Sequence, residues 1–201
     1  MKWEQDLTKD IRTTSDVYNR QDIIIYDLSR YDGRVEVTDA NRASVKEYFF
    51  KIKDTCRAVM EIGVCRNGER SFSHIFLDNK LDNTIYVGID LDDKSFLNNT
   101  EKNIHTIKGS SFDVEKNMEF FRSIGVEEFD FIFIDGDHSI MGVLNDWEYS
   151  RMLSKEGIVG FHDTSWHLGP REFVNNLNTE KWNVVPNTCP KDWGVGFAWQ
   201  K

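Results

Sequence analysis

Three polar side chains that could do chemistry follow the apolar run 129–134: Asp135, Asp137 and His138. A near-continuous apolar run is typical of a parallel strand buried on both faces. Ligands bind beyond the carboxyl ends of such strands, which is where these side chains would lie. The alternative is that Asp137 or Ser139 caps the helix that follows. A helix cap does not account for all of these polar groups together.

A second apolar run, 157–161, is followed by His162 and Asp163. If its strand lies beside the strand before Asp135, these groups meet at one edge of the sheet. Carboxylates with an imidazole suit a divalent cation, because oxygen favours magnesium or calcium and nitrogen favours manganese, iron or zinc. Without a cation the close acids would repel each other and one would bind a proton. A hydrogen-bonded structural cluster is the alternative.

Two further residues are typical of a site for a nucleotide-like ligand. Gly63 ends an apolar run before a helical stretch, so the backbone can pass close to a ligand and the helix N-terminus offers free N–H groups. Asp90 ends the next apolar run, where an acid accepts hydrogen bonds from a ribose diol. The alternatives are a tight structural turn at Gly63 and a helix cap at Asp90. The spacing around Gly63 is not GxGxxG, so this glycine alone is a weak signal.

The elements that must position these residues alternate between strand and helix patterns. Short apolar runs alternate with segments of helical period, which predicts a mostly parallel sheet covered by helices on both faces. Helical spacing of apolar residues occurs at 45–56 and 140–147. The connection 187–193 is too short for a crossover helix, so the last two strands should pair antiparallel. The expected strands are 58–63, 84–90, 104–108, 129–135, 157–162, 182–186 and 194–200.

Composition limits the classes of protein that the chain can belong to. Its 201 residues are 39% hydrophobic and 13% aromatic, enough for one domain with a sizeable core. The net charge of -9 repels a phosphate backbone, so we expect no nucleic-acid partner. The apolar runs are about half of a bilayer span and no apolar leader is present, so we expect a cytoplasmic protein without a membrane partner. The three cysteines form no CxxC pair and predict neither disulfides nor a zinc site.

Taken in order along the chain, these motifs resemble the class I S-adenosylmethionine-dependent methyltransferases. The likeness extends over roughly residues 40–201 and is greatest for the branch with macrolide-sugar O-methyltransferases and cephalosporin-hydroxylase-like proteins. It implies an α/β fold, a Rossmann-like doubly wound sheet of seven strands with the last strand antiparallel and helices on both faces. The motifs that carry the resemblance are 59–64, 86–90, 108–111, 133–139, 160–164 and 169–174.

The resemblance also implies roles for individual residues. His138, three residues after Asp135, would be the general base, and both residues would be catalytic. A divalent metal, Mg²⁺ or Mn²⁺, would be bound by Asp135, His162 and Asp163. The residues that would bind S-adenosylmethionine are Glu61, Gly63 and Val64 near the methionine part, Asp90 at the ribose, Ser110 and Ser111 beside the adenine, and Asp135.

Three positions depart from the family pattern. Asn67-Gly68 stands where consecutive glycines are usual, Ser110 where an acid is usual, and His162 where Glu is often found. The neutral ring of His162 lowers the negative charge of the metal site, which should favour softer ions over magnesium.

We therefore expect S-adenosylmethionine-dependent O-methylation of a small hydroxylated molecule, a sugar or a phenol, assisted by a divalent metal. One alternative is a protein that binds S-adenosylmethionine without methyl transfer and acts as a regulatory or interaction module. Another is an NAD-dependent oxidoreductase, which would need the GxGxxG turn that the chain lacks. Residues 39–201 would form the methyltransferase domain and 1–38 an extension that caps the site. Trp166 and His167 are candidates for the acceptor pocket, and a homodimer is left open.

Overall fold

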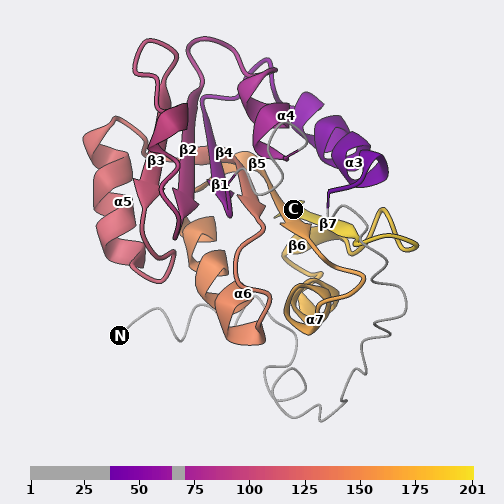
Figure 1. Cartoon of the computed structure of the whole chain (residues 1–201). Helices are drawn as coiled ribbons and strands as arrows, with labels where there is room; N and C mark the ends of the chain where they lie inside the picture. Colours follow the sequence, from indigo (N-terminus) through magenta and orange to yellow (C-terminus); the bar gives the residue numbers. More distant parts are fainter. Residues whose placement is uncertain (1–36, 65–70) are drawn as a thin grey trace.

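The computed structural model describes residues 37–64 and 71–201, and within these ranges the chain folds around one seven-stranded sheet (Figure 1). The strand order is β3-β2-β1-β4-β5-β7-β6. The strands are β1 (Ala58–Ile62), β2 (Ile85–Asp90), β3 (Ile104–Lys108), β4 (Phe129–Ile134), β5 (Leu153–His162), β6 (Trp182–Val185) and β7 (Val195–Gln200). The helices are α3 (Asp39–Phe50), α4 (Ser73–Leu77), η3 (Ser95–Leu97), α5 (Val114–Ser123), α6 (Ile140–Asp146), η4 (Trp147–Met152) and α7 (Leu168–Asn176).

The pairing of the strands confirms the expected sheet. Strands β1 to β5 pair in parallel, and β7 pairs antiparallel with both β5 and β6. The expected strands lie within a residue or two of the observed ones, except that β5 begins at Leu153 rather than at residue 157. The exposed Lys155 and Glu156 interrupt the apolar run there, so the sequence pattern conceals the start of the strand.

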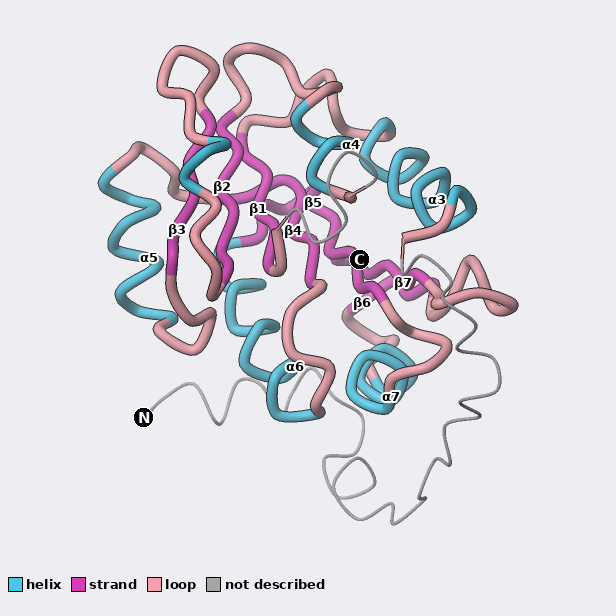
Figure 2. The backbone as a smooth tube through the Cα atoms, viewed as in Figure 1, coloured by secondary structure: helices cyan, strands magenta, loops and turns pink. Residues whose placement is uncertain are grey.

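Helices cover both faces of the sheet (Figure 2). On one face α5, α6 and α7 contribute Phe121, Val143 and Phe173 to a core that contains Met60 of β1. On the other face, residues of α3 and α4 form a second core with Val59, the residue of β1 that precedes Met60. Successive strand residues therefore point to opposite faces, as the pleat requires, and both faces are apolar.

Of the two expected helices, α3 differs in its bounds from the sequence pattern, whereas α6 begins at Ile140 as predicted. Helix α3 begins earlier than residue 45, because the Thr38 side chain accepts a hydrogen bond from the Asn41 N–H and caps it. The helix also ends before Cys56, whose thiol is nevertheless buried. Helix α6 begins after Ser139, which accepts from the Gly142 N–H at 2.9 Å, so one of the polar residues after β4 is a helix cap.

Some expectations fall partly outside the described residues. Residues 1–36 lie outside them, so the capping role of the first 38 residues stays a prediction. Cys56 and Cys189 are free thiols as expected, whereas Cys65 is not among the described residues. No helix in the described ranges combines the length and the apolar character that a membrane crossing needs.

Candidate active site

The turn after β1 passes so close to the turn after β4 that only glycine fits. Gly63 has a φ of +85°, and a Cβ atom built on it would lie 2.1 Å from the carbonyl oxygen of Asp135. The Gly63 N–H donates to the Ile89 carbonyl at 2.9 Å, and the Asp135 N–H donates to the Ile62 carbonyl at 2.9 Å. The two turns are thus joined through the backbone, and Gly63 is required for their contact.

A cavity of about 440 Å³ lies beyond the carboxyl ends of β1, β2, β3 and β4. This position and size are typical of ligand sites in open α/β sheets. The cavity brings together five residues that the sequence assigned to cofactor binding, namely Gly63, Asp90, Ser110, Ser111 and Asp135. Leu91 and Phe112 also line it, and both are large exposed apolar side chains.

Asp90 is held in place by backbone N–H groups. Its Oδ2 accepts from the Val64 N–H at 2.7 Å, and its Oδ1 accepts from the Asp92 N–H at 2.8 Å. The ammonium group of Lys94 lies 4.0 Å from Oδ2. Asp90 therefore orders the turn after β2 rather than capping a helix. Val64 is buried and does not line the cavity, so its predicted cofactor contact stays a prediction and its observed role is to position Asp90.

Glu61 lies beside the cavity without lining it. Its side chain is buried and accepts a hydrogen bond from the Tyr86 hydroxyl. Burial raises the pKa of Glu61 to about 8, although hydrogen bonds from Tyr86 and Ser73 favour the charged form. The predicted contact of Glu61 with the methionine part of the cofactor stays a prediction.

Asp146 is a buried acid near the cavity that the sequence reasoning missed. It is fully buried on α6, and its Oδ2 has no hydrogen-bond partner among the described residues. Burial raises the pKa of Asp146 to about 6, against hydrogen bonds from Ser111 and Asn145. The available signal was its position three residues after Val143 and directly before Trp147, on the apolar stripe of the helix.

The acids and histidines after β4 and β5 meet, as their parallel pairing requires. His162 Nδ1 lies 3.0 Å from Asp135 Oδ1 and 3.4 Å from Asp163 Oδ2. His138 Nε2 lies 2.8 Å from Asp163 Oδ2 and 3.8 Å from Asp135 Oδ1. Asp135, His162 and Asp163 are buried, whereas the His138 side chain is 22% exposed. His138 is therefore the member of the cluster that faces outward.

The cluster keeps its imidazoles charged when no cation is bound. Burial alone would lower the pKa of His162, but the carboxylates of Asp135 and Asp163 raise it to about 10. Burial also acts to lower the pKa of His138, but the same two carboxylates outweigh it and raise that pKa to about 9. The positive rings in turn hold the pKa of Asp135 and Asp163 below the usual range, against the effect of burial.

The donor set fits a divalent cation. Asp135, His162 and Asp163 each offer a ligand atom, and these atoms lie within 4.8 Å of one another. Asp163 Oδ1 is buried and accepts no hydrogen bond within the described part of the chain, so it can accept a metal bond. A cation would replace the proton on the His162 imidazole, because metal ligands must be deprotonated.

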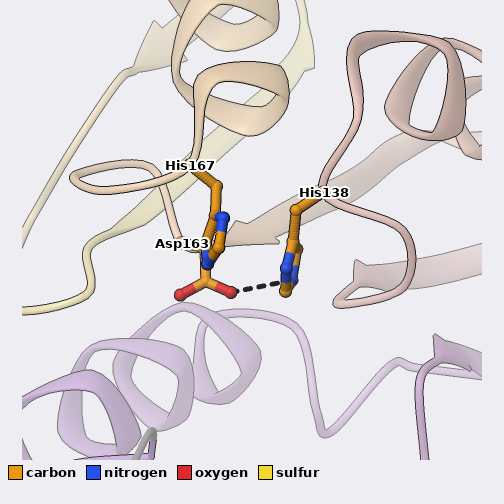
Figure 3. Close-up of side chains that lie close together, drawn as sticks. All are labelled: His138, Asp163 and His167. Carbon is orange, nitrogen blue, oxygen red and sulfur yellow. Dashed lines mark ion pairs between the residues drawn. The ribbon is translucent and has the colours of Figure 1, made fainter. Parts of the chain in front are cut away.

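The two residues named for the acceptor pocket differ in their surroundings. Trp166 donates its indole N–H to the Asp192 carbonyl at 3.0 Å and packs near Trp193, which indicates a structural role. His167 instead stacks on His138, with ring centroids 4.1 Å apart and planes 25° apart (Figure 3). Nothing in the local sequence pattern signals this contact, because the two histidines come from different loops.

The sheet order with its antiparallel β7, and the cavity at the carboxyl ends of the first four strands, define the class I S-adenosylmethionine-dependent methyltransferase fold. Residues 18–164 match the model of a family described as a methyltransferase domain. The match spans more than half of the chain, and the chain belongs to this family. A search of curated proteins finds no match.

Solved structures of several methyltransferases share the fold. MycE, from the mycinamycin biosynthetic pathway, was solved in complex with Mg, SAH and mycinamycin VI. Its sequence is 18% identical to this chain, and the TM-score is 0.56. The match covers 79% of this chain and 48% of MycE. This chain thus spans about half the length of MycE. An O-methyltransferase from Bacillus cereus with SAH is 14% identical, with a TM-score of 0.55 over 93% and 94% of the two chains. TomG from Streptomyces achromogenes, solved with SAM, is 14% identical, with a TM-score of 0.55 over 88% and 87%.

Proposed function

We propose that this protein is an S-adenosylmethionine-dependent O-methyltransferase for a small hydroxylated acceptor, such as a sugar or a phenol. The observation that carries the proposal is the position of His138, which is partly exposed and lies 3.8 Å from the cavity-lining Asp135. Methyl transfer to a hydroxyl group needs a base close to the bound cofactor, because the hydroxyl must lose its proton. The O-methyltransferase and macrolide-complex names of the similar structures support this choice.

The cavity residues supply the cofactor contacts in this proposal. Asp90, already oriented by two backbone N–H groups, accepts hydrogen bonds from the ribose hydroxyls. Gly63, Ser110 and Ser111 line the cavity, where the two serines would lie beside the adenine and Gly63 beside the methionine part. The bound cofactor supplies an electrophilic methyl group on a sulfonium. Glu61 would lie near the cofactor's ammonium group, whose positive charge would favour the ionised carboxylate.

Asp135, His162 and Asp163 would hold a divalent cation, Mg²⁺ or Mn²⁺. The chemistry that such a cation would supply is Lewis-acid activation, which lowers the pKa of an acceptor hydroxyl. The Mg in the MycE complex is a precedent in a similar fold. By holding the cation at the edge of the cavity, the three side chains would help to align the acceptor oxygen with the cofactor, and such alignment can supply much of the rate.

His138 removes the proton in this mechanism. Its Nε2 accepts the proton of the acceptor hydroxyl while the oxygen forms its bond to the methyl carbon and the carbon–sulfur bond breaks. The neutral ring needed for this step is disfavoured while Asp135 and Asp163 are free carboxylates, because they raise the pKa of His138 to about 9. A cation on these carboxylates would offset their charge and make the base available near neutral pH.

The test combines binding and turnover on the purified chain. We expect calorimetry to detect S-adenosylhomocysteine, and a panel of sugars and phenols to yield a methylated product in Mg²⁺ or Mn²⁺. His138→Gln should lower turnover on the order of 10²-fold or more without changing cofactor affinity. His105→Gln, on β3 outside the cluster, is the matched control.

The outcomes separate the parts of the proposal. Absence of S-adenosylhomocysteine binding would refute the function as a whole. Full activity in EDTA would remove the metal, and full activity of His138→Gln across neutral pH would remove the base. Cofactor binding without transfer to any acceptor of the panel would favour the alternative of a regulatory or interaction module.

A further inference from the structure

A second set of side chains, His138, Asp163 and His167, also converges at the carboxyl end of β5. One ligand atom from each lies within 4.8 Å of the other two. They come from the loop between β4 and α6, the end of β5 and the residue before α7. Figure 3 shows the two imidazole rings side by side, with the carboxylate of Asp163 next to them. This set shares only Asp163 with the Asp135–His162–Asp163 set.

The geometry of the second set is that of neighbouring ligands on one cation. His138 Nε2 and Asp163 Oδ2 are 2.8 Å apart. Two ligand atoms at about 2.0–2.2 Å from a tetrahedral ion are separated by about 3.3–3.6 Å, so this pair needs to open by less than about 1 Å. The buried Asp163 Oδ1 has no hydrogen-bond partner in the described ranges, and Asp163 is 3% exposed, so water does not satisfy it. His138 Nε2 is paired with Asp163 Oδ2, and a cation bound by these two atoms would take the place of the proton between them.

We propose that His138, Asp163 and His167 form a site for a transition-metal dication, with Zn²⁺ as the preferred ion, and that its occupation inhibits methyl transfer. Two imidazoles and one carboxylate favour zinc, cobalt or iron(II) over magnesium. The inhibitory part rests on the proposed function, in which His138 is the base. A cation on Nε2 uses the lone pair that would accept the acceptor's proton.

The two sets exclude each other because they share Asp163. The same oxygen, Oδ2, lies 2.8 Å from His138 Nε2 and 3.4 Å from His162 Nδ1. Magnesium on the set with two carboxylates leaves His138 free to act as the base. Zinc on the set with two imidazoles removes both the base and one ligand of the other set. Because two imidazoles and a carboxylate bind zinc more tightly than magnesium, zinc should inhibit at concentrations well below that of magnesium.

The site is tested by metal binding alone, without an acceptor. The full chain is freed of metal with a chelator and titrated with Zn²⁺ by calorimetry and with Co²⁺ by visible absorption, which reports nitrogen ligation. We expect one Zn²⁺ per chain. His167→Asn should weaken binding on the order of 100-fold, since even residues that merely support a ligand cost up to that much. Asn is also a favoured helix N-cap, so α7 is preserved in this variant.

Two control variants assign the ion to one set. His105→Asn, on β3, and His162→Asn, in the other set, should both retain Zn²⁺ binding. Zinc inhibition is then measured relative to each variant's own turnover, and His167→Asn should resist it. Wild-type affinity in His167→Asn, or loss of Zn²⁺ only in His162→Asn, would overturn the proposed site. An inactive wild type that binds Zn²⁺ through His167 would refute the proposed function and support the site.

Discussion

The two halves of the sheet edge hold their functional groups by different means. After β1 and β2 the backbone does the positioning: Gly63 permits a close approach, and N–H groups of Val64 and Asp92 fix Asp90. After β4 and β5 side chains position one another through charge. The first half therefore depends on chain geometry, whereas the second depends on the charges of its side chains. Substitutions in the two halves should affect different measurements.

The largest effect should come from Gly63→Ala, because this residue joins the halves. Its added Cβ would meet the Asp135 carbonyl at 2.1 Å, in a backbone conformation with φ of +85°. We expect loss of S-adenosylhomocysteine binding and of turnover, with destabilisation above the roughly 1–3 kcal/mol of backbone strain alone. Calorimetry and denaturant unfolding measure these effects.

Gly125→Ala is the matched control for this substitution. It places Ala at a similar φ of +84°, with no atom within 4 Å of the new Cβ. Gly125→Ala should therefore be destabilised by backbone strain but should still bind S-adenosylhomocysteine. Equal behaviour of the two alanine variants would mean that the contact between the turns does not matter.

Asp163→Asn and Asp90→Asn should have separable effects. Asp163→Asn should lower metal-dependent turnover on the order of 10²-fold while cofactor affinity stays unchanged. Asp90→Asn should weaken S-adenosylhomocysteine by about 10-fold to 100-fold, as for loss of hydrogen bonds to a charged group, and leave the metal dependence intact. If either substitution lowered both the metal-dependent turnover and the affinity for S-adenosylhomocysteine, this result would contradict the division into halves.

Glu61→Gln should change how stability depends on pH. The folded-state pKa of Glu61 is raised to about 8, so its contribution is fully present below its usual pKa and is lost as the pH rises toward about 8. The free energy of unfolding of Glu61→Gln, relative to wild type, should therefore rise by about 1–3 kcal/mol between roughly pH 5 and pH 9. Asp135 and Asp163, whose pKa values are lowered, contribute with the opposite sign: they lose stability as the pH falls. A pH-independent difference would contradict the protonated state of Glu61.

The smallest effect should come from Asp146→Asn. The pKa of Asp146 is raised to about 6, so the wild type loses stability as the pH rises through that value, and the amide does not. We expect a gain of about 1 kcal/mol near pH 8, with cofactor affinity within a few-fold. Thermal unfolding at two pH values measures the gain. A large loss of cofactor affinity would instead place Asp146 among the binding residues.

The sequence predicted the features that depend on local pattern. Apolar runs located all seven strands, and the polar residues at their ends located the cavity and the acid–histidine cluster. It missed the start of β5, because exposed Lys155 and Glu156 break the run. It also missed the buried state of Asp146 and the stacking of His167 on His138, since both arise from contacts between elements that no local pattern records.

The contact between the turns after β1 and β4 has a mechanical consequence. Both peptide groups of Asp135 are engaged by the β1 turn, one through the hydrogen bond to Ile62 and the other through the close approach of Gly63. Neither turn can shift without displacing the other. In the proposed reaction, the spacing between the methyl donor and the acceptor oxygen would therefore be set by two strands whose turns are joined through the backbone.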